Sequence, residues 1–193
     1  MARPREFDYE QALHQAMDAF WAKGYRSTSL EDLLKAMAIG KGSFYEAFGD
    51  KRQLFISALE AYTKLTTQRM LRQLHGDRPF LDKLDGIFDK IIETALSDND
   101  RRGCMIANSA IELSPHDDEI ERLVATELRR IENAYWRAIA HAQKNGEIAK
   151  DKNARALARF VVCNLNGLVV ISKAMPDRST LVDIKRVVIS TFR

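Results

Sequence analysis

The sequence is poor in the residues that mark several common protein classes. Only two cysteines occur in 193 residues, which is too few for a disulfide framework. Four prolines and very little period-two alternation argue against a fold rich in strands. The longest apolar region, 160–171, is interrupted by two asparagines and a glycine and is shorter than the roughly 18 residues that a membrane-spanning helix needs. No disulfide scaffold, β-rich fold or membrane contact is therefore expected.

A large excess of charge of one sign is missing too. The 30 basic and 27 acidic residues leave a net charge of +3. Residues 1–52 hold eight of each sign, starting with Arg3, Arg5 and Glu6, so this segment is neutral overall. Binding to nucleic acid must therefore be argued from the positions of individual charges and not from their sum. The early charges also argue against a signal peptide, and we expect a reduced protein of the cytoplasm.

Apolar residues recur at helical spacing through most of the chain, which predicts an all-α fold. Asp8 is a candidate N-cap of the first helix, and Gly24 is a candidate C-terminal stop. Ser114 and Pro115 are expected to start a long late helix as its N-cap and first residue. The pattern predicts further helices over 30–37, 43–48, 50–76, 80–95, 103–113, 115–146, 153–173 and 179–193.

The segment 27–55 has the pattern of a helix-turn-helix. An amphipathic helix of two turns, a tight break and a short second helix follow one another. The first of these helices can begin with a capping box of Thr28 and Glu31, or with one of Ser29 and Asp32. The second helix of such a motif enters the major groove of DNA and presents its N-terminal residues to the base edges.

Small, hydroxylated and basic residues stand at the helix N-termini of this segment. Small residues allow the backbone to approach the duplex, and a helix N-terminus attracts a phosphate. Lysine can contact a phosphate or a guanine, and serine and tyrosine hydroxyls can donate to phosphate oxygens. The candidate DNA-binding residues are Thr28, Ser29, Lys41, Gly42, Ser43, Tyr45 and Lys51.

Residues 8–55 resemble the TetR family of bacterial transcriptional regulators. Two positions depart from the family pattern, since Ala38 replaces a usual glycine and Gly40 a usual serine or threonine. The resemblance implies about nine helices, a homodimer formed through the last two, a ligand pocket in the C-terminal domain, and repression as the commoner behaviour. It is carried by Gly24-Tyr25, Thr28-Ser29, Lys41-Gly42-Ser43-Phe44-Tyr45, Phe48, Lys51 and Leu54-Phe55.

Residues 154–171 are apolar nearly all round, which indicates a helix buried on several sides. Gly167 permits close approach of another helix, and Val187 lies on a second apolar face of the last predicted helix. A homodimer through 153–173 and 179–193 is expected, with its two DNA-reading helices about 34–36 Å or a multiple of this distance apart. A monomer that buries the whole helix is the alternative.

The sensor is expected around residues 103–112. Cys104, Asn108 and Glu112 are spaced four apart and share one face of a short apolar helix. This stretch is similar to a Gly-Cys segment found in a subgroup of TetR-like regulators, some of which respond to electrophiles or oxidants. A helix N-terminus with Arg101 and Arg102 nearby favours the thiolate. The alternative is a small buried cysteine without reactivity.

Two further residues complete the expected sensor region. Trp136 is a candidate pocket residue, and Cys163, within an apolar run, is expected to be inert core. The four histidines are scattered, so no metal site or cofactor is predicted.

The sequence thus predicts a DNA-binding domain over 1–52 and a helical effector-binding and dimerisation domain over 53–193. The expected function is a non-enzymatic repressor that a small molecule, an electrophile or an oxidant releases from a palindromic operator. A thiol enzyme that pairs Cys104 with His116 or His141 is one alternative. A helical adaptor that no longer binds DNA is another.

Overall fold

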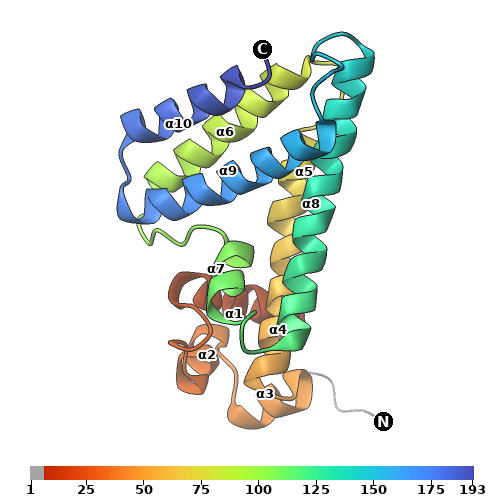
Figure 1. Cartoon of the computed structure of the whole chain (residues 1–193). Coiled ribbons are helices and arrows are strands. Elements are labelled where there is room, and N and C mark those ends of the chain that lie inside the picture. The colour runs from red at the N-terminus through yellow and green to blue at the C-terminus, as the bar shows by residue number, and fades with distance from the viewer. Residues whose placement is uncertain (1–6) are drawn as a thin grey trace.

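The computed structural model describes residues 7–193, so Arg3, Arg5 and Glu6 lie outside the described residues. The described chain is built of helices and the turns between them, which confirms the all-α prediction (Figure 1). The elements in chain order are α1 (Tyr9–Lys23), α2 (Leu30–Met37), α3 (Lys41–Phe48), α4 (Lys51–Tyr62), the π-helical turn η1 (Thr63–Thr67), α5 (Gln68–Arg72), α6 (Phe80–Ser97), α7 (Met105–Glu112), α8 (Asp118–Lys144), α9 (Ala154–Ala174) and α10 (Arg178–Ser190).

Two long helices connect the ends of the molecule. α4, η1 and α5 form one continuous helix, because Tyr62, Thr63 and Gln68 all keep right-handed helical dihedral angles. With these three elements taken as one, the described residues contain nine helices, the number expected. α8 runs beside this helix, and Figure 1 shows α1, α2 and α3 at the lower end of the pair and α6, α9 and α10 at the upper end.

Local capping explains where the first helices begin and end. The Asp8 carboxylate accepts a hydrogen bond from the Gln11 N–H at 3.1 Å, and Gly24, with a φ of 83°, ends α1. Of the two capping boxes that the sequence left open, the structure forms that of Ser29 and Asp32. Each of these side chains satisfies a backbone N–H at the start of α2 that the helix itself cannot satisfy.

The turn after α2 explains one departure from the TetR pattern. Ala38 has a φ of 53° and a ψ of 39°, in the left-handed region where glycine is favoured. Its N–H still reaches the carbonyls of Leu34 and Lys35, so the helix is capped with alanine at this position. The cost of the strained backbone is local, and the geometry of the turn is retained.

The first of two hydrophobic clusters holds together the lower end of the molecule in Figure 1. This cluster contains residues from the four helices α1, α2, α3 and α4. It also includes α7 and the start of α8, since Met105, Ile106 and Val124 are buried in it. The Phe20 ring packs edge-on against Phe55, with ring centroids 5.0 Å apart. The helices of the N-terminal segment thus share a core with residues more than fifty positions further along the chain, and the division at residue 52 remains a prediction.

The second cluster holds α6, α8, α9 and α10 together. Fully buried side chains of α6, such as Leu84, Ile87 and Phe88, meet Tyr135 of α8 and Leu168 of α9. α10 lies along α6, and α9 crosses α8 (Figure 1). This cluster supports the upper ends of the two long helices.

The predicted start of α8 is wrong. Ser114 and Pro115 lie in a turn, and the helix begins at Asp118 with Asp117 as its N-cap. The Asp117 carboxylate accepts from the N–H groups of Glu119 and Ile120 and also binds the Arg52 guanidinium through two hydrogen bonds of 2.7 and 2.9 Å. The Arg52 contact, followed by these backbone bonds, lowers the pKa of Asp117 to about 2. A long-range ion pair to α4 therefore also holds the residue that caps α8.

Candidate DNA-binding surface and effector cavity

The start of α3 presents an accessible surface with one exposed lysine. Phe44 is fully buried and Phe48 nearly so, which fixes the helix against the first cluster. Lys41 and Gly42 on the opposite side are exposed, and the Tyr45 side chain is 48% exposed. A Cβ added at Gly42 would meet no atom within 4 Å, so the backbone here is open to a close approach by another molecule.

Two further predicted contact residues lie beside this surface. Ser43 is half-buried in the first turn of α3, and Ser29 is exposed at the start of α2. The Ser29 hydroxyl donates to Asp32 at 2.6 Å. The Lys23 ammonium, 2.8 Å from the Asp32 carboxylate, and then Ser29 lower the pKa of this carboxylate well below its usual range. The acid that caps α2 therefore carries its own counter-ion.

Two other predicted contact residues occupy different places. The Thr28 side chain is fully buried, and its hydroxyl donates to the Gly24 carbonyl at 2.6 Å, so it is removed from the set of direct DNA contacts. The Lys51 ammonium lies 4.3 Å from the centre of the Tyr25 ring and is half-buried, and this desolvation lowers its pKa. Lys51 therefore packs on Tyr25 in the loop between α1 and α2, and its own ammonium is the cation at the start of α4.

A cavity of about 450 Å³ has Trp21 of α1 in its lining. Its walls come from the continuous α4–η1–α5 helix, from α6 and α9, and from the loop between α6 and α7, with Ile131 from α8. Most of the lining is apolar, including Tyr62, Met70 and Leu165. A mostly apolar site with few polar groups and a volume of roughly 300–1,000 Å³ is typical for small-molecule ligands.

Cys104 lines this cavity as the N-cap residue of α7 and is half-buried. The buried Tyr62 side chain lies next to it, and burial followed by the influence of Cys104 raises the pKa of Tyr62 well above its ordinary value. The π-helical turn that follows Tyr62 widens the helix at the same wall, and such turns occur frequently at functional sites.

The other predicted sensor residues lie elsewhere. Asn108 does not line the cavity but contacts two residues that do. Its amide donates to the Arg102 carbonyl at 2.9 Å, and its side-chain oxygen accepts from the Lys173 ammonium at 3.3 Å. Trp136 does not line the cavity; it is 38% exposed, and the Arg155 guanidinium lies 4.2 Å from its ring centre. The prediction that Trp136 belongs to the sensor is therefore wrong, and its ring stacks with Arg155 at the surface instead.

Glu112 also points away from the cavity. Its carboxylate accepts hydrogen bonds from the N–H of Tyr25 at 3.0 Å and the N–H of Arg26 at 2.7 Å, in the loop between α1 and α2. Gly24 passes so close that a Cβ on it would lie 2.9 Å from a Glu112 oxygen. Glu112 is thus a connection between α7 and the DNA-binding helices, and its assignment as a ligand residue is corrected.

The other end of α7 is attached to the same helices. The Trp21 indole N–H donates to the Gly103 carbonyl at 2.9 Å. The Arg102 guanidinium lies 4.3 Å from the centre of the Trp21 ring and 3.6 Å from the Asp18 carboxylate. Because Arg102, Gly103 and Cys104 also line the cavity, one segment contacts both the cavity and α1.

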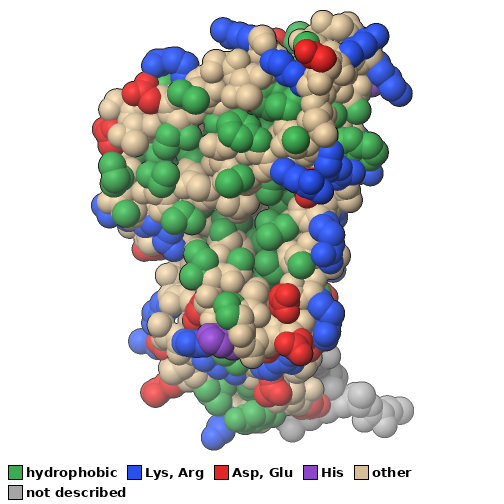
Figure 2. Space-filling model, in the orientation of Figure 1, with side chains coloured by type: hydrophobic (Ala, Val, Ile, Leu, Met, Phe, Trp, Pro, Cys, Tyr) green, Lys and Arg blue, Asp and Glu red, His purple; other side chains and the backbone are tan. Residues whose placement is uncertain are grey.

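α9 and α10 carry an exposed apolar surface, defined by Phe160, Cys163, Gly167, Val170 and Val187. All but Gly167 are exposed, and Figure 2 shows hydrophobic side chains gathered over α9. The prediction that Cys163 is buried core is wrong, because α9 turns its Val161 and Leu165 face inward instead. α9 is long and apolar enough to cross a membrane, with only 22% of its apolar window buried, yet it packs here against α6, α8 and α10.

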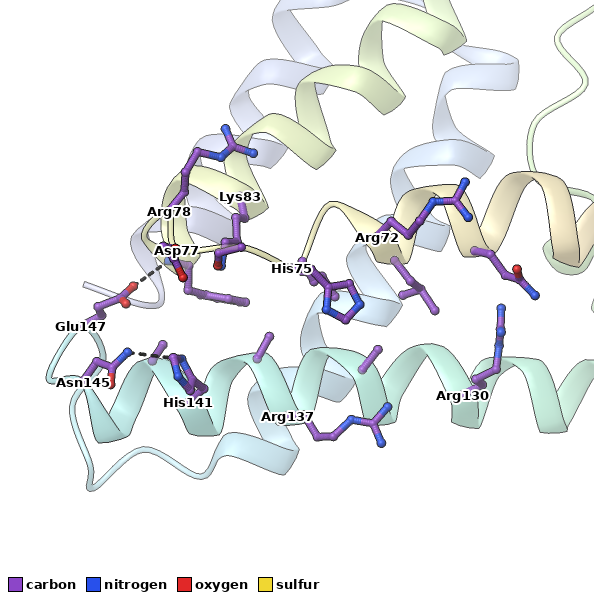
Figure 3. A pocket seen from close by; sticks show the side chains of 18 residues that line it. Arg72, His75, Asp77, Arg78, Lys83, Arg130, Arg137, His141, Asn145 and Glu147 are labelled. Carbon is purple, nitrogen blue, oxygen red and sulfur yellow. Dashed lines mark hydrogen bonds between the residues drawn. The ribbon is translucent and has the colours of Figure 1, made fainter.

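A second, more polar groove of about 800 Å³ lies at the far end of α8 (Figure 3). It is lined by His75, Lys83 and Arg130 among others, and Lys83 donates to the Gly76 carbonyl. Figure 3 shows His75 on the loop before α6 opposite His141 on α8. Among residues 7–193, no cluster of three or more histidine, cysteine or acidic side chains is placed to hold a metal ion.

An amphipathic helix followed by a short helix with an open N-terminal surface defines a helix-turn-helix regulator. The family model described as "Bacterial regulatory proteins, tetR family" matches residues 12–58. The model described as "Tetracyclin repressor-like, C-terminal domain" matches residues 81–188. The chain belongs to the TetR family and is a DNA-binding transcriptional regulator, not an enzyme, which excludes the thiol-enzyme alternative.

Individual relatives agree with this assignment. The uncharacterized HTH-type transcriptional regulator YezE of Bacillus subtilis (strain 168) is 34% identical over 95% of both chains. The HTH-type transcriptional repressor ComR of Escherichia coli (strain K12) is 28% identical over 89% of this chain and 82% of its own. A cysteine mutant of the TetR family regulator CifR, solved in complex with 26-bp double-strand operator DNA, superposes with a TM-score of 0.89 at 28% identity over the full length of both chains.

Proposed function

We propose that this protein is a cytoplasmic homodimeric repressor that leaves a palindromic operator when its cavity is occupied or Cys104 is modified. The observation that carries the proposal is the open N-terminal surface of α3, on a chain that matches an operator-bound regulator over its full length. The name of the relative ComR supports repression. Its DNA contacts are made by Ser29, Lys41, Gly42, Ser43 and Tyr45, with Lys51 as a supporting cation.

The dimer is proposed to form through α9 and α10. An apolar surface that includes Phe160 and Val170 is exposed in the single chain, and exposed apolar surface of this kind marks association sites. The glycine at 167 on the same surface allows two helices to approach closely. A two-fold axis through this surface gives the protein two copies of α3 for the two halves of a palindrome.

Replacement of Lys41 by alanine tests the DNA contacts. Each phosphate contact contributes about 0.9 to the slope of log affinity against log salt, so the change is expected to reduce the slope by about 2 in a dimer. The measurement is a salt series of mobility shifts with the DNA upstream of the protein's own gene. Lys144→Ala, at the far end of α8, is the matched control and is expected to keep the full slope.

Two results contradict this assignment. If the wild-type protein shows no salt-dependent binding to any tested operator, the adaptor alternative replaces the repressor. If Lys41→Ala keeps the wild-type slope and affinity, the DNA contacts lie elsewhere on the surface.

Cys104 is proposed to be the site of covalent signalling. The Cys104 thiolate attacks an electrophilic carbon conjugated to a carbonyl, so that a carbon–sulfur bond forms and the displaced π electrons take up a proton from water. With a peroxide, the thiolate is oxidised to a sulfenic acid while the O–O bond breaks and the second oxygen leaves as hydroxide. The adduct occupies the cavity beside Tyr62 and next to Gly103, whose carbonyl holds Trp21 of α1. A signal at the thiol thereby reaches the DNA-binding helices.

Replacement of Cys104 by serine tests this signal. The variant is expected to keep operator affinity and to lose release by a quinone or a peroxide. Cys163→Ser, which changes the proposed dimer surface, is compared with its own untreated operator affinity and is expected to keep release. Mobility shifts with and without the reagent give the comparison, and mass spectrometry gives the modified residue. Unchanged release from Cys104→Ser eliminates the thiol as the sensor and leaves reversible ligand binding as the only signal.

A further inference from the structure

The Lys173 ammonium is a half-buried cation at the wall of the effector cavity. It lies in the last turn of α9, and its Nζ donates to the Arg102 carbonyl at 3.4 Å and to the Asn108 oxygen at 3.3 Å. Both bonds are long, and neither acceptor is charged. No carboxylate pairs with Lys173 among residues 7–193, whereas a partly buried charge is stabilised by an opposite charge.

The rest of the cavity has the same charge imbalance. Arg69, Lys90 and Arg101 are exposed cations that line the opening. Asp98 is the acid of the lining, and its carboxylate is engaged by the Arg102 backbone N–H at 2.7 Å and by the Arg102 guanidinium at 3.2 Å. The cavity thus combines apolar walls with an unpaired cation in its interior and further cations at its mouth.

The position of Lys173 places a bound anion close to the segment that contacts α1. A Cβ added at Gly103 would lie 3.1 Å from the Lys173 side chain, so the lysine stem packs directly on the residue before Cys104. Leu65, Ile91 and Val162 continue the lining away from this point as apolar wall. An anionic head at Lys173 leaves an apolar tail in contact with that wall.

We propose that the effector of this cavity is an apolar molecule carrying one carboxylate, with its carboxylate bound to Lys173 and its tail along the apolar wall. The inference deepens the proposed function, since it gives the chemical class of the effector. The effector carboxylate replaces the Arg102 carbonyl and the Asn108 oxygen as the acceptor of the Lys173 ammonium. The segment of Arg102 and Gly103 then loses its hydrogen bond from Lys173 of α9. Because the Gly103 carbonyl accepts from Trp21 of α1, a shift of this segment moves the DNA-binding helices.

Binding of three eight-carbon probes without DNA tests the inference. Octanoate carries the carboxylate, octanol is neutral, and octylamine is cationic. Trp21 lines the cavity and Trp136 does not, so a change in tryptophan fluorescence reports on occupancy, and calorimetry confirms it. The wild-type protein is expected to bind octanoate about 10- to 100-fold more tightly than octanol, as expected for one charge-assisted hydrogen bond, and octylamine more weakly than both.

Replacement of Lys173 by methionine keeps a long apolar stem and removes the charge. This variant is expected to bind octanoate and octanol with similar affinity, and Lys173→Arg is expected to retain the preference for octanoate. Lys144→Met, an exposed lysine outside the cavity, is the matched control and keeps wild-type affinities. Thermal melts verify that each variant is folded, and Lys173→Gln replaces Lys173→Met if the latter does not fold.

Equal affinity of the wild-type protein for octanoate and octanol, or an octanoate preference that survives Lys173→Met, overturns the inference. A parallel mobility shift separates it from the proposed function. Octanoate binding with no operator binding refutes the repressor and leaves the anion site standing. Operator binding with no preference for octanoate refutes the anion site and leaves the repressor standing.

Discussion

Replacement of Val170 by aspartate is expected to convert the protein into a folded monomer that binds its operator about a thousandfold more weakly. Val170 is 43% exposed on α9, so the aspartate stays solvated in the single chain and the protomer keeps its fold. In the proposed dimer the same side chain is covered by the partner, where an unpaired carboxylate costs several kcal/mol. Loss of the dimer removes the second half-site and the gain in affinity that two linked contacts provide.

Analytical ultracentrifugation and mobility shifts on one operator measure the two effects together. Ile111→Asp is the matched control, because Ile111 is also an exposed apolar residue, at 69%, but lies on α7 outside the surface of α9 and α10. The control is expected to remain dimeric. A Val170→Asp protein that sediments as a dimer shows that the interface lies on another face.

Replacement of Glu112 by alanine is expected to destabilise the protein by about 2 kcal/mol and to weaken operator binding. The carboxylate is the acceptor for the N–H groups of Tyr25 and Arg26, and both bonds are charge-assisted. Without it, α7 loses its hold on the loop that precedes α2. For a chain of this length the loss corresponds to a fall in melting temperature of about 4–8 °C.

Glu112→Gln separates the effect of the negative charge from that of the side-chain size, since glutamine has the same length and keeps one acceptor oxygen. Its effect on stability is expected to be roughly half that of alanine. Glu121→Ala, which removes an exposed carboxylate of α8 with no ion pair among the described residues, is the control for the loss of a negative charge. If Glu112→Ala melts at the same temperature as Glu121→Ala, the contact with the α1–α2 loop contributes nothing to stability.

Neighbouring residues show where local pattern stops being informative. Thr28 and Ser29 are both hydroxyl residues before the same helix, and either can form the capping box by sequence. The structure turns Ser29 outward to Asp32 and buries Thr28 against the Gly24 carbonyl. The choice depends on how α2 packs on α1, which spacing along the chain does not specify.

The sensor helix shows the same limit on a larger scale. The spacing of Cys104 and Glu112 predicts one shared helix face, but Cys104 is the N-cap of α7 and Glu112 is its last residue. At a rise of 1.5 Å per residue, the two lie about 12 Å apart along the helix axis. Cys104 therefore meets the cavity while Glu112 meets the α1–α2 loop. Lys173 was overlooked because a lysine in the last turn of a helix is ordinary in sequence, where it complements the helix dipole.

The sequence by itself determined the all-α class, the positions of most helices and the helix-turn-helix with its exposed Lys41 and Gly42. These features depend on apolar periodicity and on caps such as Asp8 and Asp32, whose partners lie within a few residues. Only the tertiary structure decided that Asp117 caps α8, that Glu112 holds the DNA-binding helices and that Lys173 faces the cavity with no counter-ion among the described residues. The physical reason is that each of these side chains is positioned by a partner more than sixty residues away, and local propensity carries no information about such a partner.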